Sequence, residues 1–147
     1  TFNFLFYTQL ANSKDETLSA LAHKSLKEVK YHLRHTSNWL VRLGDGTKES
    51  NAKTQIALNE LCMYTDEIFE MDSLDTELFN EGIAVDNSSL KSAWDAMSNN
   101  ILTKAKLIRP EEEYMATGGK KGLHTEYLRF ILSEMQYLQR AYPNAKW

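Results

Sequence analysis

The feature that most constrains the fold is a helical pattern of about 30 residues, from Lys14 to Leu43. Apolar side chains recur along it at the three- and four-residue spacing of one helix face, and Gly44 follows as a left-handed stop. At about 1.5 Å per residue, such a helix is roughly 45 Å long. Because its apolar face needs long neighbours to cover it, the pattern predicts an assembly of helices.

The rest of the chain carries further helical patterns and no persistent strand-like alternation. The predicted helices cover residues 1–11, Ser50 or Asn51 to about Met71, Asp86 or Ser88 to about Leu107, and about His124 to Tyr142. Residues 72–87 form a connector that can hold a short helical turn at 74–79. Ser13, followed by Glu16, predicts a capping box for the longest helix. We therefore expect an all-α bundle in a single domain over residues 1–147.

Composition narrows the classes of partner. A net charge of −3 without a dense basic run disfavours nucleic acid. No apolar run reaches the roughly 20 residues of a membrane span, so no membrane partner is expected. The one cysteine, Cys62, is expected to be buried and inert and favours a reducing compartment, the cytoplasm. The chain opens at Thr1 inside an apolar pattern without a cap, which we interpret as a start within a helix whose N-terminal portion is missing.

The middle of the longest helix carries one carboxylate and two imidazoles. At about 100° per residue, Glu28, His32 and His35 fall within roughly 60° of Trp39, on a face that we expect to turn toward the core. The set is either a metal site or a hydrogen-bonded polar cluster. Di-iron bundles use Glu-x-x-His pairs on two helices and single glutamates on two others. Tyr31, not His, stands three residues after Glu28, and no Glu-x-x-His occurs elsewhere in the chain, so we favour the polar cluster and assign no catalytic or metal-binding residue.

A second candidate site is a glycine- and lysine-rich loop before the last helix. It comprises Gly118, Gly119, Lys120, Lys121 and Gly122, with His124 following. Backbone N–H groups, two lysines and a helix dipole would suit an anion such as phosphate. The spacing is not that of a P-loop, and no strand precedes it. The alternatives are a turn held by residues 111–113 and a contact with a partner protein.

The aromatic residues divide into two groups. Trp39 and Trp94 stand at helical spacing and are expected in the core. Trp147, with Tyr137 and Tyr142, makes an apolar C-terminal tail, which is typical of a segment that docks on another subunit.

Five segments together carry a family resemblance. They are EVKYHLR at 28–34, WLVRLGDGT at 39–47, EGIAVD at 81–86, GGKKGLHTE at 118–126 and EMQYLQR at 134–140. In order and sequence they resemble the structural, non-catalytic subunits of ring 1,2-phenylacetyl-CoA epoxidase, in the phenylacetic acid degradation family. The resemblance runs through nearly all 147 residues and covers the C-terminal part of the family's chain.

The resemblance implies a ferritin-like helical bundle within a multicomponent oxygenase. It implies no cofactor in this subunit, a di-iron centre in a catalytic partner, and NADPH acting through a reductase component. The other epoxidase components are the implied partners, and a homo-oligomer is an option for the isolated protein. In this setting Lys120 and Lys121 become candidate contacts for the phosphates of the CoA thioester. The alternative function is a catalytically active metal-dependent oxidase that uses Glu28 and His32.

Overall fold

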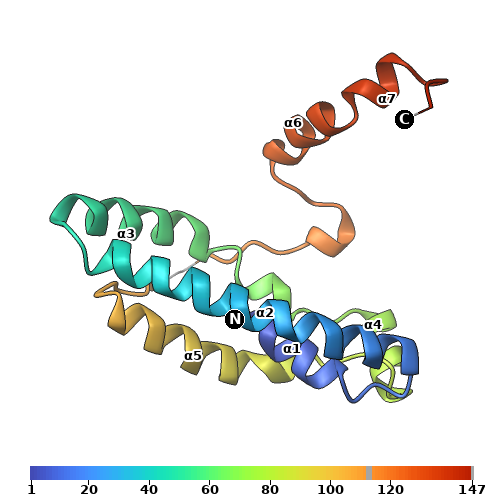
Figure 1. Ribbon diagram of the computed structural model, residues 1–147, viewed down its shortest axis with the longest axis horizontal. Coiled ribbons are helices and arrows are strands. Elements are labelled where there is room, and N and C mark those ends of the chain that lie inside the picture. Colours follow the sequence, from blue (N-terminus) through green and yellow to red (C-terminus); the bar gives the residue numbers. More distant parts are fainter. Residues whose placement is uncertain (112–113, 147) are drawn as a thin grey trace. The chain divides into compact units, whose positions relative to one another are not determined.

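The computed structural model of this chain describes residues 1–111 and 114–146. Within these ranges the regular elements are helices and there is no strand, which confirms the all-α class (Figure 1). The α-helices are α1 (Phe2–Leu10), α2 (Glu16–Gly44), α3 (Lys48–Cys62), α4 (Ser73–Asn80), α5 (Lys91–Lys104), α6 (Glu126–Met135) and α7 (Tyr137–Ala141). Short 3-10 helices are η1 (Asp66–Phe69), η2 (Ser88–Leu90) and η3 (Gly119–Lys121). The chain divides into two compact units, Thr1–Ala116 (unit 1) and Thr117–Trp147 (unit 2), and the single domain stays a prediction.

The longest helix, α2, confirms the predicted pattern to within two residues at each end. Asp15 caps its start, because the Asp15 carboxylate accepts a hydrogen bond of 2.9 Å from the backbone N–H of Leu18. The predicted capping box of Ser13 is wrong. The Ser13 hydroxyl instead donates a hydrogen bond of 2.7 Å to the carbonyl of Ile83. The side chain that the sequence pattern assigned to the helix cap therefore makes a tertiary contact.

The C-terminal end of α2 is fixed by close backbone packing. Gly44 is buried, and a Cβ at this position would collide with the carbonyl oxygen of Ala105 at the end of α5. The side-chain amide of Asn51 donates to the carbonyls of Gly44 at 2.7 Å and Lys106 at 3.2 Å. One side chain of α3 therefore ties the ends of α2 and α5 together.

Helix α3 ends well before the predicted end at Met71. Its last residue is Cys62, whose carbonyl accepts a hydrogen bond of 2.8 Å from the hydroxyl of Thr65. This bond satisfies one of the acceptors left free at a helix end, and the chain turns there into η1. The helical spacing that continues from 63 to 71 is thus divided between a turn and a 3-10 helix.

The elements after η1 follow the predicted order. Helix α4 starts with a reciprocal capping box between Asp72 and Asp75, which confirms the helical turn expected in the connector. The Asp86 carboxylate accepts from the N–H of Ser88 at 3.0 Å and opens η2 and α5. Helix α5 stops short of its predicted end, and Lys106 then adopts a φ of 55°.

Two hydrophobic clusters hold unit 1 together. The first comprises Leu10, Ala22, Phe69, Val85 and Leu90, with Phe2, Leu5, Phe6, Leu18 and Trp94 packed against it. The second comprises Leu102, Ala105 and Leu107, with Leu40, Val41 and Leu58 packed against it. The first joins the N-terminal half of α2 to α1, and the second joins its C-terminal half to α3 and α5. No helix in the described ranges combines the length and apolar character needed to cross a membrane.

Unit 2 contains η3, α6 and α7. One continuous helix was predicted here, but Gln136 separates α6 from α7. The helical pattern predicts Leu128, Ile131, Leu132, Met135 and Leu138 on an inward face; Leu128 is half-buried, but the other four are exposed. Tyr137 and Tyr142 are also exposed, while Trp147 lies outside the described residues. The four exposed apolar residues share one face of the amphipathic helix α6 and its continuation in α7, and no described residue of unit 2 belongs to either buried cluster.

Removing the side chain of Leu90 tests the first cluster. Leu90 is 2% exposed, so Leu90→Ala should lower the free energy of unfolding by about 2–4 kcal/mol through lost burial and a cavity. Leu74→Ala, at a position 59% exposed, is the control and should cost less than about 1 kcal/mol. Urea unfolding of both variants measures these changes. Equal losses of unfolding free energy in the two variants would contradict the assigned core.

Candidate functional site

The predicted polar face of α2 faces solvent. Glu28, His32, His35 and Trp39 are all exposed, Trp39 by 49%. The prediction that this face turns toward the core is therefore wrong for the described structure. The core side of the helix is centred about 120° away, on the stripe that contains the buried Ala22.

The error has a physical cause, because α2 carries two apolar stripes. One contains Ala22, Leu26, Val29, Leu33, Leu40 and Gly44, which are buried or half-buried. The other contains Leu21, Tyr31, Trp39 and Leu43, which are between 43% and 53% exposed. Both have helical spacing, so periodicity alone does not say which stripe the neighbouring helices cover.

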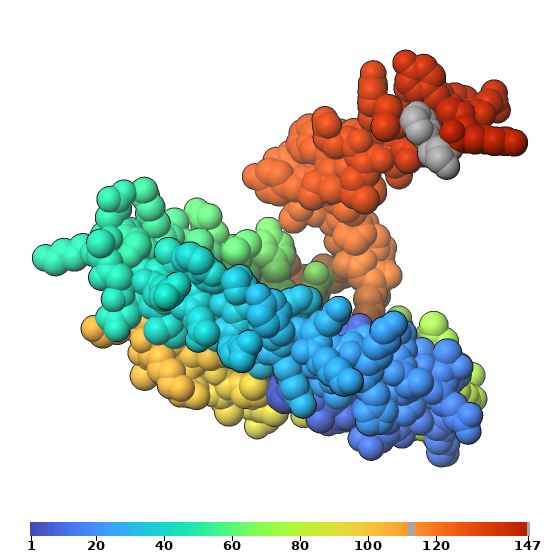
Figure 2. All heavy atoms as spheres, in the orientation of Figure 1, coloured from blue at the N-terminus to red at the C-terminus, as the bar shows by residue number. Residues whose placement is uncertain are grey.

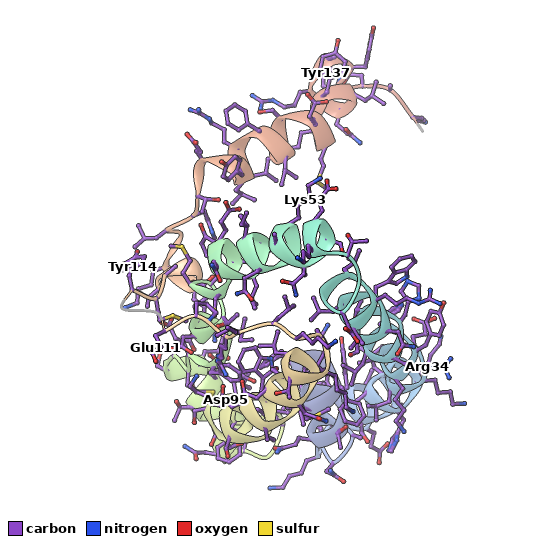
Figure 3. All side chains as sticks on the ribbon, turned by 90° about the vertical axis from the view of Figure 1, so that its left-hand side faces the viewer. Arg34, Lys53, Asp95, Glu111, Tyr114 and Tyr137 are labelled. Atoms are coloured by element: carbon purple, nitrogen blue, oxygen red, sulfur yellow. The ribbon has the colours of Figure 1, made fainter. Side chains whose placement is uncertain are left out.

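The exposed stripe is organised by ring contacts. The Tyr31 ring stacks on His35 with centroids 5.7 Å apart, and His35 meets Trp39 edge-on at 6.5 Å. The guanidinium of Arg34 lies 5.8 Å from the Tyr31 ring, and that of Arg42 lies 5.6 Å from the Trp39 ring. Figure 3 places Arg34 on the outer side of the bundle. Ring and cation contacts thus replace the predicted hydrogen-bonded polar cluster.

These residues do not fit a di-iron centre. Such a centre needs several carboxylates and imidazoles that converge from different helices. Glu28 and His32 share one solvent-facing side of α2. Tyr31 occupies the position three residues after Glu28, where a Glu-x-x-His pair would have its histidine. In the part of the chain that the structure describes, no three His, Cys, Asp or Glu side chains are grouped to hold a metal ion. That no metal binds to this subunit stays a prediction, and no chemical step is derived through iron here.

The loop Gly118–Gly122 is closed by its own backbone. Gly118 and Gly122 adopt positive φ angles of 92° and 82°. The N–H groups of Lys121 and Leu123 donate to the carbonyl of Gly118 at 2.8 and 3.0 Å, and that of Gly122 donates to Gly119 at 3.1 Å. Three amides that an anion seat would use already have acceptors.

The side chains around this loop are open to solvent. Lys120, Lys121 and His124 are exposed, and Glu126 adds a carboxylate to the first turn of α6. The loop therefore presents two ammonium groups beside a helix start that already has an acidic residue. The alternative turn held by residues 111–113 includes Glu112 and Glu113, which lie outside the described residues. Binding of a partner or a phosphate by this loop stays a prediction.

The structure reveals a charged network that sequence reasoning missed. Lys91 Nζ lies 2.7 Å from Asp66 Oδ1 and 3.8 Å from Asp95 Oδ2. Arg109 Nη1 lies 2.7 Å from Asp95 Oδ1, and its guanidinium lies 5.0 Å from the Trp94 ring. Burial disfavours the charge of Arg109, but the hydrogen bond and charge of Asp95 outweigh this and raise the pKa of Arg109. Two carboxylates of unit 1 are thereby neutralised by two cations.

The sequence contained only part of the signal for this network. Lys91 and Asp95 are one helical turn apart, a spacing that favours an ion pair. Asp66 and Arg109 come from η1 and from the segment after α5, so only the fold brings them in. Beside the network, α2, α3 and α5 border an open hollow of about 370 Å³. Its lining is mainly apolar, with Leu33, Leu40, Leu61, Cys62 and Ile101, and it also includes Arg109. Cys62 is buried, as predicted.

Replacing Arg109 tests the network. Arg109→Met should lower the free energy of unfolding by about 1–3 kcal/mol, because the Asp95 carboxylate loses its short hydrogen bond while two-thirds buried. The exposed pair of Lys53 and Glu49 supplies the control, since Lys53→Met should cost less than about 0.5 kcal/mol. Chemical denaturation measures both. Adding Asp95→Asn to the Arg109→Met variant should recover part of the lost free energy of unfolding. Fully additive losses from the two substitutions would contradict a coupling between Arg109 and Asp95.

The comparisons with known proteins agree with this all-α architecture. The family model described as "Phenylacetic acid catabolic protein" matches residues 1–147. The chain is also 48% identical over 141 residues to one of the subunits of the 1,2-phenylacetyl-CoA epoxidase of Escherichia coli (strain K12). The match covers 96% of this chain, which spans 57% of the length of that relative. The resemblance expected from the five segments is confirmed, and the chain belongs to the phenylacetic acid catabolic protein family, with its ferritin-like helical fold.

Proposed function

We propose that this chain belongs to a structural subunit of a multicomponent ring 1,2-phenylacetyl-CoA epoxidase in aerobic phenylacetate catabolism. Its task there is to hold the di-iron catalytic subunit in place. The observation that carries the proposal is the 48% identity, over nearly the whole chain, to a protein named as a subunit of such an epoxidase. Because the chain spans 57% of that relative, the activity of the whole complex is part of the proposal.

The arrangement of polar groups in unit 1 supports a scaffolding task. Asp66 and Asp95, the two carboxylates of the charged network, already have Lys91 and Arg109 as partners. The Glu28 and His32 side chains lie on the outside of the bundle. In this proposal the di-iron centre belongs to the catalytic partner, NADPH acts through the reductase, and the complex works in the cytoplasm.

The alternative is a metal-dependent oxidase that uses Glu28 and His32. It requires further carboxylates or imidazoles to join this pair on the outer face of α2. The structure offers His35 as the nearest imidazole on that face, and its ring stacks on Tyr31. No specific observation favours this alternative over the scaffold.

Iron content and partner binding separate the two functions. The complete protein, purified alone, should hold little iron and should bind the di-iron catalytic subunit in a stable complex. Glu28→Ala should leave the iron content unchanged, because the residue is no ligand. Metal analysis and size-exclusion chromatography of the mixture provide the readouts. Near-stoichiometric iron with oxygen-consuming turnover by the protein alone would establish the oxidase instead.

The lysine loop gives a second, separate test. If Lys120 and Lys121 contact the CoA phosphates, changing both to Ala should weaken phenylacetyl-CoA binding by the assembled complex about tenfold, with a larger effect at low salt. The control is the double variant Lys48→Ala, Lys53→Ala, which removes two exposed lysines of α3. Titration calorimetry measures binding of the thioester, and size-exclusion chromatography measures assembly of the complex. A loss of assembly alone would make the loop a contact between subunits.

A further inference from the structure

The chain that follows α5 runs between two helices of unit 1. Figure 2 shows α3, in teal to green, and α5, in yellow to orange, on the two sides of α2. In Figure 3 the chain continues from the end of α5 toward Glu111 between α3 and α5. We define the strap as Ile108, Arg109 and Pro110. Its position allows it to contact both helices.

On the α3 side, a side-chain amide holds the strap. Gln55 Nε2 donates to the carbonyl of Ile108 at 2.7 Å, and Gln55 Oε1 accepts from the Ile108 N–H at 2.9 Å. Gln55 Nε2 also donates to Asn59 Oδ1 at 2.8 Å, which fixes the direction of the amide. One turn earlier, Asn51 bonds to the carbonyl of Lys106. Two residues of extended chain rise about 6.6 Å and four helical residues about 6.0 Å, so alternate residues after α5 meet successive turns of α3.

On the α5 side, a charged group holds the strap. Arg109 Nη1 donates to Asp95 Oδ1 at 2.7 Å and to Asn99 Oδ1 at 3.3 Å, and its guanidinium lies 5.0 Å from the Trp94 ring. Burial disfavours the Arg109 charge, whereas Asp95 and then Cys62 raise the pKa of Arg109, so Cys62 is a neighbour of the guanidinium. Arg109, Trp94 and Cys62 all line the hollow of about 370 Å³. The strap is thus part of the wall of this hollow.

The strap is held by polar bonds with little apolar burial. Ile108 is 77% exposed, whereas the preceding Leu107 is 6% exposed and belongs to the second cluster. Pro110 has no N–H and adds no donor to the pairing with α3. A segment with few buried apolar contacts and solvent-exposed hydrogen bonds opens at a lower free energy than the helices beside it. Leu107 therefore fixes one end of the strap, and the three residues after it are the least strongly held.

We propose that the strap opens and closes the side of the hollow at Cys62, and that Gln55 is the residue that holds it closed. When the Gln55 amide releases Ile108, the strap turns outward from Leu107 and takes the Arg109 guanidinium into solvent. The Cys62 thiol then becomes accessible to small molecules. Re-forming the two bonds between Gln55 and Ile108 closes the hollow again. All these groups belong to unit 1, so the device is independent of the proposed function.

Hydrogen exchange of the Ile108 N–H tests the role of Gln55 in the complete protein. Gln55→Ala removes the acceptor that the described contacts give this N–H, so its exchange rate, resolved by NMR, should rise about tenfold. Amides in the middle of α3 and α5 should keep their exchange rates. Gln9→Ala makes the same substitution at an exposed position of α1 and should change the Ile108 rate less than about twofold.

Alkylation of the Cys62 thiol by iodoacetamide tests whether the strap controls access to the hollow. Although the hollow is open to solvent elsewhere, Cys62 is 6% exposed, so alkylation should wait for the strap to open. Opening of the strap exposes little surface, and the alkylation rate of the wild type should therefore depend only weakly on urea at low concentration. Gln55→Ala should raise this rate about tenfold, and Gln9→Ala should change it less than about twofold. Mass spectrometry of the peptide that contains Cys62 measures the rate.

Several results would overturn the proposal. A wild-type alkylation rate that depends on urea as steeply as global unfolding would mean that Cys62 is reached only when the helices unfold. Alkylation of the wild type at the rate of a free thiol would mean that the strap covers nothing. In Gln55→Ala, an unchanged Ile108 exchange rate would remove Gln55 from the device, and faster exchange with unchanged alkylation would separate the strap from the hollow. The first two results are obtained with the wild type, so they decide the question even where Gln55→Ala does not fold.

Discussion

Burial of one stripe along α2 is the interaction on which unit 1 depends. The helix has 29 residues, whereas α1, α3 and α5 have 9, 15 and 14, so no single neighbour covers it. The stripe is therefore shared between two clusters, one around Ala22 and one at Leu40 and Val41. Small residues at both places, Ala22 and Gly44, let neighbouring backbones come close. The hollow lies between the two clusters, because Trp94 of the first and Leu40, Leu58 and Leu102 of the second line it.

Local sequence signals predicted the elements well, because most of their causes are local. Helix α2 ends at Gly44 as expected, and the carboxylates of Asp72 and Asp86 start the helices that follow. Errors arose where a tertiary bond competed with a local one. Ser13 would suit a cap, but its hydroxyl donates to the carbonyl of Ile83, and Asp15 caps the helix instead. The family segments identified the fold class, whereas periodicity alone gave only a helical bundle.

The candidate site was harder to predict, since it depends on which face of a helix its neighbours cover. Glu28, His32 and His35 were correctly placed on one face, but that face is exposed. A search for ligand spacing finds such sets on one helix and misses groups assembled from several segments. The network of Asp66, Lys91, Asp95 and Arg109 is of the second kind, because η1, α5 and the following segment each contribute to it.

The two sets of charges in unit 1 differ in a way that bears on function. In the network, each cation has a carboxylate oxygen at 2.7 Å, and the Arg109 and Asp95 side chains, 29% and 33% exposed, are the more buried pair. On the outer side of α2, Arg34 and Arg42 lie against aromatic rings without a carboxylate partner among the described residues. Solvent tolerates such cations, but folding of unit 1 gives no reason to line them up with three exposed rings. The structure therefore gives the charges of the network a stabilising role in unit 1, whereas the described contacts give the two outer arginines no such role.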